Sequence, residues 1–271
     1  MRSLLTILIL FLCAPAFAWG PKGHRVVADI ARDHLSASAR RAIVDLLGSD
    51  DLAEISTWAD GIKRQRPETN AWHFVDIPWN ADGFNEQRDC YHATSHSLSS
   101  LGDHHNCVVD RIAMFEAVLA DKRASRADRV EALKFVVHFV ADVHQPLHAV
   151  GEARGGNDVH ITQFGRTECG SRPCDLHGAW DIGLIEHARR SEREHVSQLE
   201  EQISREYLDK KPEGTPEQWA DESFRIAHTV WLQDGSAVDE NYYRRNIPIL
   251  DEQLARAGVR LAMLLNRALG E

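Results

Sequence analysis

Apolar residues recur three and four positions apart along most of the chain, with polar residues between them. This spacing is typical of helices that bury one face and expose the other. Ser36 precedes one such segment and is the kind of residue that caps a helix N-terminus. The pattern predicts helices at residues 25–34, 37–47, 108–119, 130–143, 176–188, 191–208, 216–232 and 249–269.

Two segments favour β structure, residues 72–77 and residues 158–164. Residues 83–106, rich in His, Ser, Asp and Gly, are expected to form a long loop or a broken segment. No low-complexity run, repeat or Pro/Gly/Ser-rich linker divides residues 19–271, a length that single domains reach. We therefore expect one domain with a mostly α fold.

Residues 1–18 have the form of a secretory signal peptide. Arg2 is followed by a short apolar run at residues 4–12 and by the small-x-small ending AFA. The apolar run is too short to span a membrane, and no later segment is long enough. We expect cleavage after Ala18, which would export the chain and make Trp19 the first residue of the mature protein.

The charge balance limits the kinds of partner. The chain carries 31 basic and 41 acidic residues, which gives a formal net charge of -10. That balance argues against a protein that follows nucleic acid along a basic surface. A phosphate ester substrate would need another source of positive charge, and bound metal ions could supply it.

Cysteine usage points to disulfides. Of five cysteines, Cys13 would leave with the signal peptide. The other four are an even number without the C-x2-C spacing of zinc sites, so two disulfides are favoured in an exported chain. Three pairings are open, and we expect those that close the two short loops, Cys90 with Cys107 and Cys169 with Cys174.

Histidine and aspartate recur at a spacing that suits metal binding. His138 and Asp142 stand four apart on a predicted helix, so both point from one face. His177 and Asp181 repeat this interval, and Pro146 ends the first helix just before His148. Imidazole and carboxylate groups suit Zn²⁺. In a chain with fifteen histidines, one such pair also arises by chance, as a core histidine or a capping aspartate.

Two further fragments place these residue types beside tryptophan. STWAD ends at Asp60, and AWHFVD contains His73. The tryptophans could form a dry wall around a site or belong to the core, and Asp60 could equally be a surface or capping residue. His144 points away from the Asp142 face of its helix and is left out of the site as a supporting or solvated residue. The loop histidines could form an adventitious metal site but are expected to be solvated; they are His92, His96, His104 and His105.

Together these fragments resemble one protein family. From residue 19 to residue 181 the chain reads W-G-x-x-G-H, W-A-D, W-H-F-V-D, H-F-x-x-D-x-x-Q-P-L-H, G-G-N and L-H-x-x-W-D. This is similar to the trinuclear-zinc, single-strand-specific nucleases of the mung bean nuclease type, which are related to zinc-dependent phospholipase C. The resemblance implies a single-domain helical bundle with little β structure at residues 19–271.

The resemblance also implies three Zn²⁺ ions and nine ligand residues. Signal peptide cleavage would itself create one ligand, the terminal amine. The ligands would be Trp19, through its amine and carbonyl oxygen, with His24 on one ion; Asp60, His73 and His138 on a second, with Asp142 bridging these two; and His148, His177 and Asp181 on the third.

Further roles are implied around these ions. Asp60 and Asp142 would orient the attacking water, and Lys63 would face the reacting phosphate unless it is an ordinary solvated lysine. Phe74 would stack on a base unless it belongs to the core. The substrate-binding residues would be Phe74, Asp76 and Asn157.

The implied function is a secreted or periplasmic, monomeric endonuclease without a membrane partner. It would cut single-stranded DNA and RNA to 5′-phosphate products and act as a 3′-nucleotidase on nucleotides. The alternative is a phospholipase C acting on lipid headgroups. Asp181 argues against this alternative, because the lipase pattern ends in glutamate. An exported zinc-binding protein without activity is a further alternative, although such a protein would fill its metal shells with protein ligands.

Overall fold

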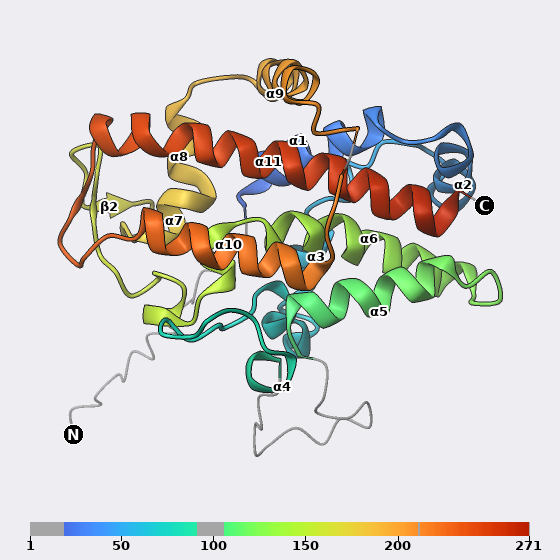
Figure 1. Cartoon of the computed structure of the whole chain (residues 1–271), viewed down its shortest axis with the longest axis horizontal. Helices are drawn as coiled ribbons and strands as arrows, with labels where there is room; N and C mark the ends of the chain where they lie inside the picture. The colour runs from blue at the N-terminus through green and yellow to red at the C-terminus, as the bar shows by residue number, and fades with distance from the viewer. Residues whose placement is uncertain (1–18, 91–105, 211, 271) are drawn as a thin grey trace, which may run out of the picture.

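The computed structural model describes residues 19–90, 106–210 and 212–270, and this part of the chain is mostly helical (Figure 1). The N-terminal half contains α1 (Pro21–Asp33), α2 (Ala37–Leu47), α3 (Trp58–Ile62), the 3₁₀ helix η1 (Pro67–His73), α4 (Glu86–Asp89), α5 (Val108–Ala120) and α6 (Arg126–Val143). The middle contains η2 (Pro146–Ala149), η3 (Glu152–Arg154), β1 (Thr162–Gln163), β2 (Glu168–Cys169), β3 (Arg172–Pro173), α7 (Leu176–Gly178), the π-helical turn η4 (Ala179–Gly183) and α8 (Leu184–His187). The C-terminal part contains α9 (Glu192–Glu206), α10 (Pro216–Val230), β4 (Ala237–Val238) and α11 (Glu240–Leu269).

Helix α6 forms the centre of the fold. Residues 135–143 are all buried, as expected of a helix that is apolar on nearly every side. Its start is capped by Ser125, whose side chain accepts a hydrogen bond from Asp128 N. Because α6 packs against α1, α3, α5, α10 and α11, His138 and Asp142 project into the interior of the bundle.

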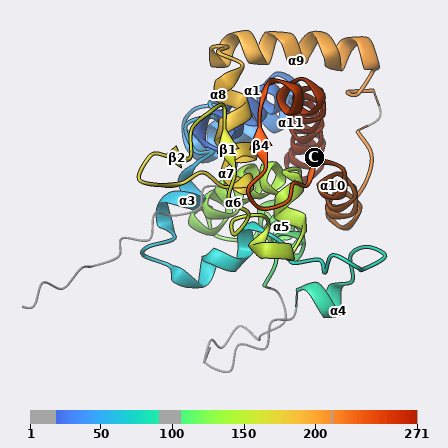
Figure 2. The ribbon, with the colours of Figure 1, turned by 90° about the vertical axis from the view of Figure 1, so that its left-hand side faces the viewer.

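Helix α11 runs along the bundle beside α1, and α9 lies across these two helices (Figures 1 and 2). The sequence predicts its start at Ile249, but the helix begins at Glu240 and continues through Pro248. Asp239 caps the start by accepting from Tyr242 N, and Tyr242 itself is buried. Capping and burial of the first turns therefore outweigh the cost of the internal proline.

The two strand predictions are largely wrong. Within residues 72–77, the first two complete η1. The backbone of the others makes isolated hydrogen bonds instead of a strand ladder, such as Val75 N to His148 O (2.8 Å) and Val108 N to Phe74 O (3.0 Å). Within residues 158–164, only β1 forms, and it pairs with β4 in parallel. The antiparallel β2–β3 hairpin was not predicted. Apolar runs this short do not reveal whether a partner strand is near.

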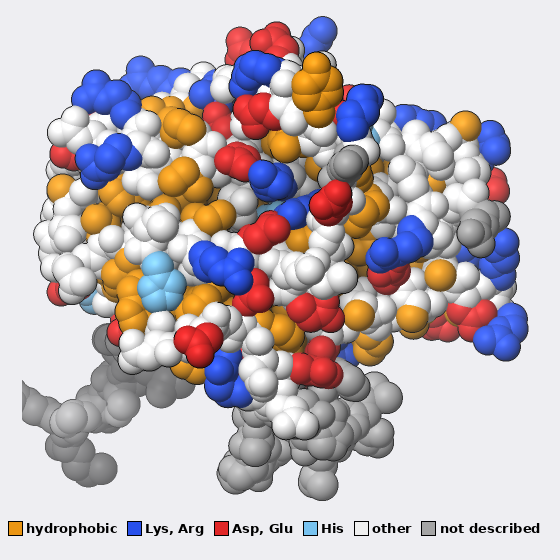
Figure 3. Space-filling model, in the orientation of Figure 1, with side chains coloured by type: hydrophobic (Ala, Val, Ile, Leu, Met, Phe, Trp, Pro, Cys, Tyr) orange, Lys and Arg blue, Asp and Glu red, His pale blue; other side chains and the backbone are white. Residues whose placement is uncertain are grey.

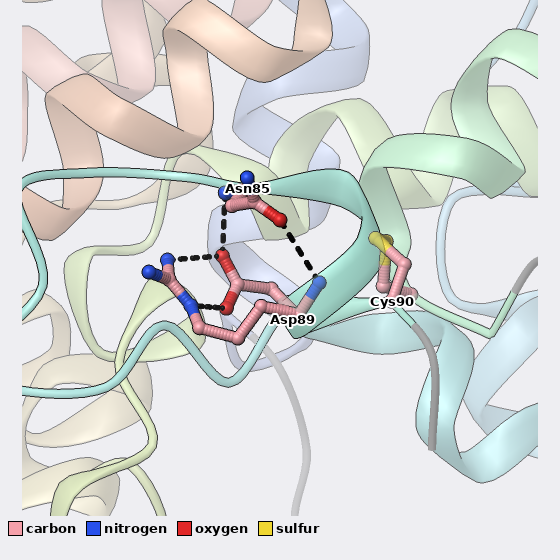
Figure 4. Close-up of a disulfide and its surroundings, with 5 residues drawn as sticks. Asn85, Asp89 and Cys90 are labelled. Atoms are coloured by element: carbon pink, nitrogen blue, oxygen red, sulfur yellow. Dashed lines mark hydrogen bonds and ion pairs between the residues drawn. A yellow bond between two sulfur atoms is a disulfide. The ribbon is translucent and has the colours of Figure 1, made fainter. Parts of the chain in front are cut away.

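Both predicted disulfides are present, Cys90–Cys107 and Cys169–Cys174. Cys90 follows α4, a helix inside the predicted loop at residues 83–106, of which residues 91–105 lie outside the described part of the chain. Figure 4 shows the buried Asp89 beside this disulfide, paired with Arg88 and accepting from Asn85 N over 2.7 Å. The disulfide thus closes a segment whose near end is fixed by polar contacts.

The surface has no continuous basic area on the face shown in Figure 3, where acidic and basic side chains alternate with hydrophobic ones. Among the described helices, none combines the length and the apolar composition that crossing a membrane requires. On this face, the surface charge therefore does not by itself indicate where an anionic substrate would bind.

Candidate metal centre

Three groups of buried histidine and aspartate side chains meet inside the bundle. In each group, potential ligand atoms lie within 4.8 Å of one another. His138 belongs to two groups, and His148 Nδ1 lies 4.0 Å from Asp142 Oδ1, so the three groups form one continuous cluster. The groups are His24, Asp60 and His138; His73, His138 and Asp142; and His148, His177 and Asp181.

The cluster collects residues from most of the chain. Its members are His24 on α1, Asp60 on α3, His73 at the end of η1, His138 and Asp142 on α6, His148 on η2, His177 on α7 and Asp181 on η4. Nine residues are predicted as ligands, eight of them through side chains and Trp19 through its backbone. The structure brings the eight side chains together. The ninth, Trp19, is described below.

Asp142 lies at the centre of the cluster and is fully buried. Its Oδ2 lies 2.9 Å from His73 Nδ1 and 3.2 Å from His138 Nε2. Its Oδ1 lies 3.4 Å from His24 Nε2. A carboxylate whose two oxygens face different imidazoles has the arrangement expected of a ligand shared between two ions.

Backbone carbonyls fix three of the imidazole rings. The Nδ1 of His138 donates to Ser56 O (2.6 Å), that of His148 to His73 O (2.9 Å) and that of His177 to Gly155 O (2.7 Å). Because a carbonyl oxygen only accepts, Nδ1 carries the proton, and Nε2 of each neutral ring keeps its lone pair. This is the tautomer and orientation that a ligand to zinc needs.

The hydrogen bond from His177 Nδ1 to the carbonyl of residue 155 requires glycine at that position. Its φ of 63° lies in the left-handed region, and a Cβ there would come within 2.5 Å of Leu147 O. The missing side chain lets the Gly155 carbonyl reach the His177 ring.

Gln145 supports the third group and was not predicted. Its Nε2 donates to Asp181 Oδ1 over 2.6 Å, while its Oε1 accepts from Leu147 N. His177 Nε2 lies 3.3 Å from Asp181 Oδ2. The Q-P-L-H motif contains Gln145, but the sequence does not reveal that its amide reaches a residue on η4. Asp181 lies in a π-helical turn, a feature found often at functional sites.

Burial and charge set the protonation of the cluster. Burial lowers the pKa of His73 to about 3 and that of His148 to about 4. Burial also acts to lower the pKa of His138 and His177, but neighbouring carboxylates outweigh it and raise both. For Asp142, burial acts to raise the pKa, yet the adjacent histidines hold it well below its ordinary value. The ionised carboxylate of Asp142 thus lies among imidazole nitrogens.

Several polar atoms of the cluster make no hydrogen bond. They include Nδ1 and Nε2 of His24, Nε2 of His73 and Oδ1 of Asp142, all of them buried. Leaving such an atom unsatisfied is costly, so buried polar groups normally have a partner. Lone pairs on nitrogen and carboxylate oxygen directed into a shared interior are what a divalent transition metal ion binds.

Trp19 is fully buried next to this cluster. Its indole Nε1 donates to Ala141 O over 2.9 Å, and Gly20 N donates to Asp181 O over 2.7 Å. These contacts hold the backbone of Trp19 between α6 and η4, close to Asp142. Ligation by its terminal amine depends on cleavage after Ala18 and stays a prediction.

A cavity of about 400 Å³ opens onto the cluster. Lys63 lies on its wall, with Nζ 2.7 Å from Asp60 Oδ1. Phe74 is only partly buried, so it is not an ordinary core residue. Other predicted residues on the wall are His73, Asp76, His148, Asn157 and His177, and the sequence did not single out Asn70 and Arg154, which also line it.

Some titratable residues do not belong to the site. His144 is buried rather than solvated, because its Nδ1 donates to Val140 O and its Nε2 accepts from Arg260. Cys90 and Cys107 approach Asp110 but form a disulfide. The loop histidines His92, His96, His104 and His105 lie outside the described residues.

Comparisons with known proteins identify nucleases among the relatives of this chain. Endonuclease 2 of Arabidopsis thaliana is 29% identical to this chain, over an alignment that covers 100% of this chain and 97% of the endonuclease. Nuclease S1 of Aspergillus oryzae is 29% identical (92% of this chain, 91% of its own length), and nuclease P1 of Penicillium citrinum is 28% identical (93% and 98%). A protein-family model described as S1/P1 Nuclease matches residues 19–270, and the chain therefore belongs to the S1/P1 nuclease family.

Proposed function

We propose that this nuclease is a zinc-dependent phosphodiesterase that cuts single-stranded DNA and RNA endonucleolytically to 5′-phosphate products. It also acts as a 3′-nucleotidase. Three Zn²⁺ ions are proposed per chain, held by the residues that the sequence predicts. These are Trp19, His24, Asp60, His73, His138, Asp142, His148, His177 and Asp181.

One observation carries this proposal. Buried nitrogen and carboxylate atoms of His24, His73 and Asp142 make no hydrogen bond although they face a common interior. The same interior adjoins a cavity with an aromatic ring, a lysine and amide groups on its wall. A cation-binding interior beside a nucleotide-sized cavity favours phosphate ester hydrolysis over metal storage.

The protein groups around the cavity have distinct roles in this proposal. Bound zinc would supply a Lewis acid and lower the pKa of a water molecule. Asp60 would accept a hydrogen bond from that water and orient it. Lys63, held by Asp60, would place its positive charge beside the phosphate oxygens that gain charge during the reaction. Asn157 would donate its amide to the phosphate.

The proposed preference for single strands rests on the wall of the cavity. Its volume of about 400 Å³ is within the range of small-ligand sites and suits one nucleoside. Phe74 would stack on the base, and Asp76 would accept from its amino groups. A base can use both contacts only after leaving its partner, so unpaired strands bind without the cost of unstacking.

The proposal also includes export of the protein, which would act as a monomer. The signal peptide at residues 1–18 would direct the chain to the periplasm or the exterior, where the two disulfides persist. Removal of the signal peptide would also free the amine of Trp19.

The test is metal content per chain combined with substrate turnover. We expect about three zinc ions, rapid hydrolysis of denatured DNA, and little hydrolysis of a short-chain phosphatidylcholine. Prolonged chelation should remove activity and lower the melting temperature, and added zinc should restore both. Full turnover by metal-free protein, or faster hydrolysis of the phospholipid, would overturn the proposal.

A further inference from the structure

A second cavity, of about 510 Å³, lies next to the metal centre. Helix α7 contributes to both cavities, since His177 lines the first and Gly178 the second. Figure 2 shows the β2–β3 region beside α7 and α8 on this side of the molecule. We name the second cavity the basic pocket, and the residues used to define it are Phe164, Arg166, Arg172, Gly178, His187 and Arg189.

Positive charge in the basic pocket is only partly compensated. In the described part of the chain, no ion pair involves Arg166 or Arg189, whereas Arg172 lies 3.8 Å from Asp175. The wall also carries two acidic residues: Asp175, which in addition caps α7 through Gly178 N, and Glu186, which lies 3.7 Å from Lys22. In a chain with a net charge of -10, this is a local surplus of guanidinium groups.

The pocket also has an aromatic wall in an unfavourable backbone conformation. Phe164 and Gly165 both have positive φ, and Gln163 and Arg166 pair across them, as in a type I′ turn. Asparagine, not phenylalanine, is preferred at the first position of such a turn. The Phe164 ring stacks on His187, with centroids 3.6 Å apart and planes at 7°. The turn thus accepts backbone strain to place a ring beside Arg166.

We propose that the basic pocket binds the phosphodiester backbone of the strand whose scissile bond lies at the metal centre, with a base against Phe164. This inference rests on the proposed nuclease function. Guanidinium groups suit phosphate oxygens, and arginine with an aromatic ring is the combination that holds single strands. The two cavities meet at two places in the chain: Gly178 of the basic pocket follows His177, and Ile182 of the basic pocket follows the predicted ligand Asp181. In this proposal a long strand extends from the metal centre into the pocket, whereas a mononucleotide occupies the metal centre alone.

The test uses the zinc-loaded protein and two substrates, a 3′-mononucleotide and a single strand of about twenty nucleotides. In the variant Arg166→Gln/Arg189→Asn, the asparagine suits the positive φ of residue 189. We expect roughly tenfold higher KM for the long strand and unchanged turnover of the mononucleotide. The salt dependence of strand binding should also fall by about 0.7 in log–log slope for each phosphate that the variant no longer neutralises. Phe164→Asn, which suits the turn, should weaken strand binding while the protein still melts cooperatively.

The control is Arg123→Gln, since the Arg123 side chain is 91% exposed and lies on the loop between α5 and α6. Binding of a phosphorothioate strand, followed by fluorescence anisotropy, separates this inference from the proposed function. If the wild type binds the strand without cutting either substrate and the double variant loses binding, the basic pocket is a strand-binding site and the nuclease proposal is wrong. If long strand and mononucleotide are affected equally, or strand binding and its salt slope do not change, the pocket is not a strand site.

Discussion

The imidazole rings of His24 and His138 lie face to face, with centroids 3.9 Å apart and planes at 11°, although one comes from α1 and the other from α6. Both Nε2 atoms approach Asp142, one at each carboxylate oxygen. Burial and the neighbouring His138 lower the pKa of His24, so the stack is stable with at least one neutral ring. The pair is therefore arranged around Asp142 as a common anionic partner.

Asp142→Asn should cost more zinc and more activity than Asp181→Asn. Asp142 lies within 3.4 Å of three histidines, whereas Asp181 lies that close only to His177 and receives the Gln145 amide. We expect Asp142→Asn to lose up to two zinc ions per chain and Asp181→Asn to lose one. Elemental analysis and kcat/KM on single-stranded DNA measure this, and equal losses in the two variants would contradict a shared role for Asp142.

Gln145→Ala should weaken binding of the ion at His148, His177 and Asp181. The amide of Gln145 orients Asp181, and removal of such a supporting group typically costs 10–100-fold in metal affinity. Competition with a graded zinc chelator measures the change. Gln202→Ala, on the exposed face of α9, is the control. Wild-type zinc affinity in Gln145→Ala would show that Asp181 is oriented without the amide.

Phe74→Ala should raise KM for strands more than it lowers kcat, because stacking is present before the transition state. The expected loss is about 1–3 kcal/mol of binding free energy. Steady-state kinetics on a single-stranded oligonucleotide measure both constants. An unchanged KM would mean that Phe74 only lines the cavity.

One residue added before Trp19 should remove one zinc ion, since it converts the amine into an amide without a lone pair. Trp19 is fully buried and bonded to Ala141 O, so alanine at this position would destabilise the fold by about 3–5 kcal/mol. The matched control is therefore Trp19→Phe with a free amine, which should keep three zinc ions. Three ions in the extended protein would exclude the amine as a ligand.

His34→Gln should destabilise the protein in a pH-dependent manner. His34 Nε2 lies 3.0 Å from Glu200 Oε2, and this hydrogen bond raises the pKa of His34. Because the folded pKa exceeds the unfolded value of 6.5, the contribution is fully present below about pH 6.5 and is lost as pH rises through the folded pKa. Melting of zinc-loaded proteins should show a deficit of about 1 kcal/mol at about pH 6 that shrinks by about pH 9. A constant deficit would contradict the ionic contribution.

The sequence predicts which histidine and aspartate residues meet in the cluster better than it predicts the elements that present them. His138 and Asp142 follow from helical spacing alone, and both lie where that spacing places them. The Gln145 contact could not be predicted, because it joins η2 to η4 across a bend that no local pattern encodes. The strand predicted at residues 72–77 is wrong for a similar reason: its backbone bonds to residues near His148 and to the start of α5 rather than to another strand.

The carbonyls that hold the rings of His138, His148 and His177 belong to Ser56, His73 and Gly155. A substitution can delete a side chain, but every residue retains its carbonyl oxygen. Random mutation can therefore remove a ligand from this centre in one step, while the groups that orient three of its rings persist as long as the chain keeps its path. Ligands can accordingly be exchanged to change the metal preference of the protein, while these backbone carbonyls remain in place to orient the rings.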